Sequence, residues 1–161
     1  DFQVALTRFI SLIPALALIG FPLLSSGHGY RVGSIRIVHP WAQITASSIP
    51  GKTSAFGYLV LRNTGDKPDK LISAFAEIAE KVELRATDGA VDTPAPRPVD
   101  SVAIPAGGEV RLQSEGPHLM ILGLEKPLAE GQRFSLKLRF ERAGPITVDM
   151  FVQAGAGDAI Y

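Results

Sequence analysis

The sequence predicts an all-β domain folded as a Greek-key β-sandwich, on three observations. Apolar and polar residues alternate with a period of two over most of the chain after Gly29, which is the pattern of half-buried antiparallel strands. Segments rich in Gly, Pro, Asn and Asp separate these stretches at short intervals. No helical pattern alternates with the strands, so two packed antiparallel layers are expected instead of a parallel sheet with crossover helices.

The individual strands are expected where the alternation is strict. Phe134 and Leu136 alternate with polar neighbours in residues 133–141, and residues 145–153 repeat the pattern. Further strands are expected at residues 34–42, 54–63, 109–113 and 116–124. Residues 71–82 are the only stretch whose pattern could form a helix.

Composition limits both the size of the fold and the classes of function. A chain of 161 residues is long enough for one domain with a core and too short for two ordinary domains. Lys+Arg 16 and Asp+Glu 16 balance, so no field of the whole protein attracts nucleic acid or an anionic membrane, and nucleic-acid binding is not expected. Because the count of Cys is 0, any metal site must use nitrogen, oxygen or thioether sulfur.

The N-terminal region predicts secretion. Arg8 precedes an apolar run at residues 9–26 that ends in small residues, which is the pattern of a signal peptide. Two prolines interrupt the run, which is unfavourable for a stable membrane span. We therefore expect residues 1–26 to be a signal peptide and residues 27–161 to form one domain with no membrane span after cleavage; an uncleaved anchor is the alternative.

One strand carries a candidate metal-binding pair. In the segment 116–124, His118 and Met120 lie two residues apart, so on a strand their side chains share one face, while Leu119 and Ile121 share the other. A thioether sulfur is a soft donor suited to Cu(I), and an adjacent imidazole adds a nitrogen donor. The alternative interpretation is a core methionine beside a histidine held by backbone hydrogen bonds.

The sequence offers no pattern for catalysis, and we predict that the protein is not an enzyme. Neither a nucleophile elbow nor a His-Glu-x-x-His helix nor a Gly-rich phosphate loop occurs in a suitable context. Asp66, Asp69 and Asp100 occur in turn sequences, where aspartate is expected to bond to nearby backbone groups.

Several segments, taken in order, resemble the PCu(A)C family of periplasmic copper chaperones. The similar blocks are residues 39–45, 57–66, 81–91, 97–112, 116–144 and 146–152. The resemblance implies a cupredoxin-like sandwich located in the periplasm. It also implies that the protein binds copper(I) and delivers it to a periplasmic copper-accepting protein, such as an oxidase subunit.

The resemblance is incomplete at the copper site. The family typically adds to the His-x-Met pair a histidine at the end of the strand "VEL" and a methionine in the following loop. This chain has Arg85 at the first position and prolines, Pro94 and Pro96, in the loop. Only His118 and Met120 match. A guanidinium has no lone pair to donate, and at about 5 Å from a monovalent cation it would cost ~3 kcal/mol at an effective dielectric constant near 20.

Other candidate ligands have simpler interpretations. Met150 lies on an apolar strand face and is expected to be a core residue. His39 precedes Pro40 and is expected to be structural, whereas His28, just beyond the predicted cleavage point, could bind Cu(II) in a mobile N-terminus. Two functions stay open at this stage, a copper chaperone with a weakened site and a metal-free sandwich that binds other proteins. In both, the mature domain is expected to be monomeric.

Overall fold

The computed structural model describes residues 29–46, 50–87 and 96–153, and every regular element in these ranges is a β-strand. The strands, in chain order, are β1 (Gly29–Val32), β2 (Ile35–Ala46), β3 (Thr53–Asn63), β4 (Asp69–Phe75), β5 (Ala79–Ala86), β6 (Arg97–Pro98), β7 (Val102–Ile104), β8 (Glu109–Leu112), β9 (His118–Leu124), β10 (Arg133–Phe140) and β11 (Gly144–Gln153). Each strand expected from the alternation is present. The predicted all-β class is therefore confirmed.

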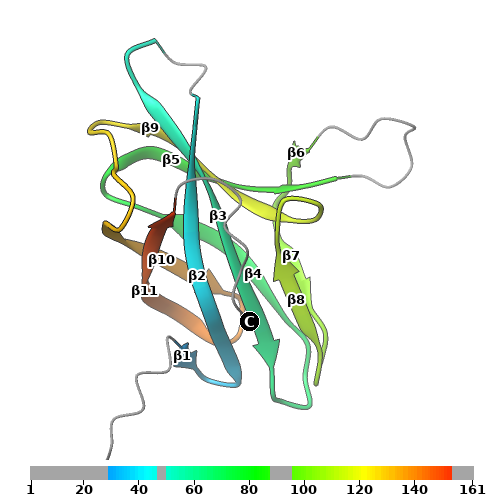
Figure 1. Cartoon of the computed structure of the whole chain (residues 1–161). Helices are drawn as coiled ribbons and strands as arrows, with labels where there is room; N and C mark the ends of the chain where they lie inside the picture. Colours follow the sequence, from blue (N-terminus) through cyan, green and yellow to red (C-terminus); the bar gives the residue numbers. More distant parts are fainter. Residues whose placement is uncertain (1–28, 47–49, 88–95, 154–161) are drawn as a thin grey trace, which may run out of the picture.

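All the strands belong to one sheet that curls on itself (Figure 1). The order across the sheet is β6-β5-β9-β3-β2-β11-β10-β4-β7, with β1 paired to β2 and β8 paired to β3. The β11–β2 pair is parallel and the other pairs are antiparallel. Strands β4 and β5 follow each other in the chain through a short turn but stand in distant places in this order. The sheet must bend to bring them together, which produces the two layers of the predicted Greek-key sandwich.

The core lies between the layers and is formed by the inward residues of the alternating strands. Its largest fully buried side chains are Ile35, Ile37, Leu59, Leu61, Leu71, Ile104, Leu119, Ile121, Leu124, Leu136, Leu138 and Phe140. Gly57 on β3 allows a close approach at the centre, because a Cβ there would lie 3.0 Å from Leu119 Cβ and 3.4 Å from Met150 Cε. Any larger residue at this position would displace core side chains.

Residues 71–82, the only stretch whose pattern could form a helix, contain no helix. The segment instead forms the end of β4, a turn in which Ala79 N donates to Ala76 O at 3.2 Å, and the start of β5. A β-bulge explains the misleading pattern: the β4–β10 register shifts at Phe140, which pairs with Leu71, so Ile72 has no partner and the period of two is broken. The interrupted alternation then resembles helical spacing.

Candidate metal centre

His118 and Met120 lie side by side on β9, facing away from the sandwich core. Residues paired across antiparallel strands share a face, and Met120 pairs with Phe56 on β3 and Glu83 on β5. The exposed fraction is 3% for His118 and 8% for Met120. The imidazole and the thioether therefore share one face of β9, as the sequence spacing predicts, and both side chains are largely buried.

The His118 ring is held by a single backbone hydrogen bond. Its Nδ1 lies 3.0 Å from the carbonyl oxygen of Gly116, which can only accept, so Nδ1 carries the proton of the neutral ring. Nε2 then bears the free lone pair, and within the described residues it has no hydrogen-bond partner. A neutral ring with Nδ1 bonded to a carbonyl and Nε2 free is one of the forms in which histidine binds a metal.

Aromatic rings border the candidate pair along β3 and β2. The Phe56 ring meets the His118 ring edge-on with centroids 5.6 Å apart. Phe56 in turn stacks on Tyr58 at 6.2 Å, and Tyr58 contacts Trp41 at 4.7 Å. The rings limit the rotation of His118, and burial raises the pKa of Tyr58.

Arg85 lies directly opposite His118 in the β5–β9 register, as an unfavourable neighbour of the candidate site. It does not present a bare charge, however, because its Nε and Nη2 donate to Glu83 Oε2 at 2.9 and 2.8 Å. Lys81 contributes a second ion pair to Glu83 Oε1 at 2.6 Å. Hydrogen bonds from Lys81 and then Arg85 hold the pKa of Glu83 below its ordinary range. The repulsion of a cation at His118 is therefore smaller than expected for an isolated guanidinium.

Sequence reasoning missed this ion-paired row, since Glu83 and Arg85 alternate like ordinary exposed strand residues. Their side chains are only 12% and 28% exposed. The i, i+2 spacing of Lys81, Glu83 and Arg85 was the available signal, because it places alternating charges on one strand face.

The comparison with known proteins identifies the family. Residues 35–152 match the family model described as "Putative lipoprotein LpqE-like". The chain belongs to the LpqE-like family. A curated relative of this LpqE-like protein, "Putative lipoprotein Lxx21020" of Leifsonia xyli subsp. xyli, is 28% identical over 142 residues, which are 85% of this chain and 81% of the relative.

Solved PCuAC domains have the same fold as this LpqE-like protein. The apo PCuAC domain from PmoF1 superposes with a TM-score of 0.66 at 28% identity, covering 80% of this chain and 100% of that domain. The copper-bound PCuAC domain from PmoF2 gives 0.63 at 28% identity, covering 80% and 99%. CuI-DR1885 from Deinococcus radiodurans gives 0.56 at 26% identity, covering 80% and 83%. The resemblance to the PCu(A)C family and the cupredoxin-like sandwich are thus confirmed.

The remaining candidate ligands of the LpqE-like protein are dispersed. Met150 is 0% exposed in the core, as expected. His39 is exposed, at the β2 bulge, with φ 51°. Pro96 is exposed and directly precedes β6, where Pro98 pairs with Arg85. His28, Pro94 and the predicted signal peptide (residues 1–26) lie outside the described residues. Within the described ranges there is no cluster of three or more His, Cys, Asp or Glu side chains that could hold a metal ion.

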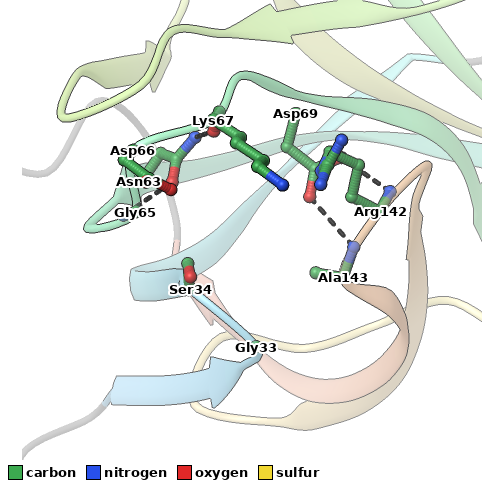
Figure 2. A pocket seen from close by; sticks show the side chains of 9 residues that line it. All are labelled: Gly33, Ser34, Asn63, Gly65, Asp66, Lys67, Asp69, Arg142 and Ala143. Atoms are coloured by element: carbon green, nitrogen blue, oxygen red, sulfur yellow. Dashed lines mark hydrogen bonds between the residues drawn. The ribbon is translucent and has the colours of Figure 1, made fainter.

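A polar pocket lies at the far end of β3, and the side chains of Asn63 and Asp69 in its lining bond to nearby backbone groups (Figure 2). The Asn63 amide donates to Lys67 O at 2.7 Å, and its oxygen accepts from Gly65 N at 3.0 Å. The Asp69 carboxylate accepts from the backbone N–H groups of Arg142 at 2.9 Å and Ala143 at 3.0 Å. The side chains of Asn63 and Asp69 therefore stabilise the turns that form this pocket. In the part of the chain that the structure describes, no helix is long and apolar enough to cross a membrane.

Proposed function

We propose that this LpqE-like protein binds Cu(I) through His118 and Met120 and passes it to a copper-accepting protein, such as an oxidase subunit. The observation that carries the proposal is that His118 and Met120 lie on one face of β9, with Nδ1 of the His118 ring already bonded to Gly116 O at 3.0 Å. Similarity to the copper-bound PmoF2 domain and to CuI-DR1885 supports the choice of metal.

The donor set favours Cu(I) over harder cations. A thioether is a poor ligand for Zn(II), and Cu(I) accepts low coordination numbers with soft donors. Two protein ligands leave coordination positions open, so a receiving protein can add its own donors before the ion is released. Copper is therefore the cargo in this proposal.

We propose a site weaker than that of a PCuAC domain with the complete ligand set. Arg85 stands in register with His118, where it cannot donate a lone pair. Glu83 offsets much of its charge but does not supply a soft donor.

We place this activity outside the cytoplasm. The LpqE-like family and the Leifsonia xyli relative are both described as lipoproteins. The apolar run at residues 9–26 is in keeping with export, so we propose that residues 1–26 are a signal peptide and that residues 27–161 form the single periplasmic domain.

The two methionines of the chain provide a matched test. Met120→Leu should lower Cu(I) affinity by at least about tenfold. Removing a residue that only supports a metal ligand typically costs about tenfold or more, and the loss of the ligand itself should cost at least as much. Met150→Leu makes the same chemical change in the core and should leave the affinity unchanged. Titration of each protein against a chromophoric Cu(I) chelator under reducing conditions measures both. Equal affinities for the parent and Met120→Leu would contradict the proposed ligands.

A metal-free protein-binding domain is the second candidate function. It is favoured by the Arg85–Glu83 ion pair, at 2.8 Å, which places a cation where a copper ligand is expected. In this case the parent protein should take no copper from the chelator at any ratio.

A further inference from the structure

The outer face of β10, in the part of the sheet away from the candidate metal site on β9, carries a row of cationic side chains. Arg133, Lys137 and Arg139 alternate with buried residues and are all exposed. In the described residues none of the three takes part in an ion pair. Asp149 on β11, opposite Ser135, is an acidic residue beside this row, and the exposed Glu141 directly follows β10. Although the whole chain has a formal charge of +0, this face is locally basic.

Apolar side chains flank the row on both neighbouring strands. The large apolar residues that are exposed within the described ranges are Ile72 at 37%, Phe75 at 57% and Phe151 at 37%. Phe75 on β4 pairs with Lys137, and Phe151 on β11 pairs with Arg133, whose guanidinium carbon lies 5.8 Å from the ring centroid. We call Ile72, Phe75, Arg133, Lys137, Arg139 and Phe151 the β10 face; its three strands are adjacent in Figure 1.

We propose that the β10 face docks the protein on an anionic membrane surface. In the headgroup layer, Lys and Arg side chains remain hydrated beside lipid phosphates while adjacent apolar side chains enter the acyl boundary. The mixture of cations and exposed Phe and Ile side chains provides both interactions. The proposal goes beyond copper binding and does not depend on it.

The arrangement of the face favours a membrane over a protein partner. Protein interfaces bury an apolar centre inside a polar rim. Here the cations occupy the central strand and the apolar side chains lie outside them. A protein covering this face would have to desolvate the charges first, which is costly unless each one is paired.

Two other occupants fit the charges poorly. A second copy docked symmetrically would bring Arg133, Lys137 and Arg139 against the same cations. The apolar segment 9–26 contains no acidic residue that could pair with them. An acidic protein partner could pair with these cations, and the vesicle experiment below distinguishes it from a membrane.

The test is co-sedimentation of the full chain with vesicles of phosphatidylcholine or of an equimolar phosphatidylcholine–phosphatidylglycerol mixture. Each Lys or Arg near an anionic surface contributes about fivefold in affinity, so Lys137→Gln/Arg139→Gln should lower binding to anionic vesicles by about 25-fold. Phe75→Ser should lower it by about fivefold through the lost apolar contact. Binding of the parent should fall as salt is raised.

Lys67→Gln/Arg97→Gln is the control, because it removes the same charge from exposed sites on a turn and on β6. It should change binding by less than about twofold. Segment 9–26 is common to all variants, and phosphatidylcholine vesicles measure its contribution. The proposal is overturned if the parent binds both vesicles equally, or if the Lys137/Arg139 variant matches the parent. Failure of the parent to bind anionic vesicles also overturns it. Chelator titration of Lys137→Gln/Arg139→Gln and of Phe75→Ser should give the parent's Cu(I) affinity, which keeps this test separate from that of the proposed function.

Discussion

The buried polar side chains at the end of β3 and the start of β4, Asn63 and Asp69, differ from the buried His118 on β9 in how many of their hydrogen-bonding atoms have a partner. Asn63 and Asp69 are 3% and 6% exposed, and their side chains bond to backbone groups of several segments. His118 is equally buried, yet its one hydrogen bond leaves Nε2 without a partner among the described residues. A buried polar group with all its bonds made stabilises a fold, whereas one with an unused lone pair is a candidate for binding.

The two groups also differ in the range of their bonds. Asp69 joins β4 to residues 142 and 143, which are more than seventy positions away in the chain. His118 bonds only to Gly116, two residues away. Loss of the first group should therefore affect stability, and changes around the second should affect binding.

The largest expected effect is the loss of stability on substitution of Asp69. Asp69→Ala removes the acceptor of three backbone N–H groups, those of Lys70, Arg142 and Ala143. The loss of three part-buried hydrogen bonds to a carboxylate should lower the free energy of unfolding by about 3 kcal/mol. Urea denaturation measures the change, and chelator titration of the folded variant should give an unchanged Cu(I) affinity.

Asp66→Ala is the matched control, because Asp66 lines the same pocket but is exposed. Its effect should be within about 0.5 kcal/mol. If both variants unfolded at the same urea concentration, the comparison between used and unused polar groups would lose its basis.

A smaller effect, on Cu(I) affinity, is expected when ligands are added around His118. Arg85→His removes a cation and adds a nitrogen donor opposite His118, so Cu(I) affinity should rise by about tenfold. The gain is below the roughly hundredfold that the ~3 kcal/mol of an isolated guanidinium would give, because Glu83 already offsets the charge. Pro96→Met, added to it, should raise the affinity further by supplying sulfur next to β6.

Arg85→Gln separates the two contributions, since it removes the charge without adding a donor. Chelator competition on all variants gives the affinities, and circular dichroism checks that each is folded. A double variant that is folded and binds no more tightly than the parent would mean that Arg85 and Pro96 do not occupy ligand positions.

The smallest effect concerns Glu83 and depends on pH. Glu83→Gln should lower the free energy of unfolding by about 1 kcal/mol near neutral pH through the lost ion pairs. Hydrogen bonds from Lys81 and Arg85 lower the folded-state pKa of Glu83 from its ordinary value of 4.5. Such a group contributes stability that is complete above the ordinary value and is lost as the pH falls through the lowered pKa. The difference between parent and variant should therefore disappear in acid.

Urea denaturation at neutral pH and at several acidic pH values measures this difference. Glu115→Gln is the control, because Glu115 is exposed and makes no ion pair within the described residues. A parent–variant difference for Glu83 that stayed constant across the acidic range would show that the carboxylate does not stabilise the fold through its charge.

Strand positions could be predicted where side chains alternate without interruption. In β10, Phe134, Leu136 and Leu138 point inward at every second position, and the sequence alone places them. At Ile72 the alternation could not decide between strand and helix, because the bulge depends on the register between β4 and β10. The local sequence contains no information about that partner.

The same division applies to the candidate site. A period of two along β9 was enough to place His118 and Met120 on one face, because the direction of side chains in a strand is a local property. The sequence could not place Arg85 opposite His118, nor the Asp69 carboxylate against residues 142 and 143. Strand order and register, which decide these contacts, arise from burying all the apolar faces at once. The sequence therefore determined the all-β class and the candidate ligands, and the tertiary structure decided which charges surround them.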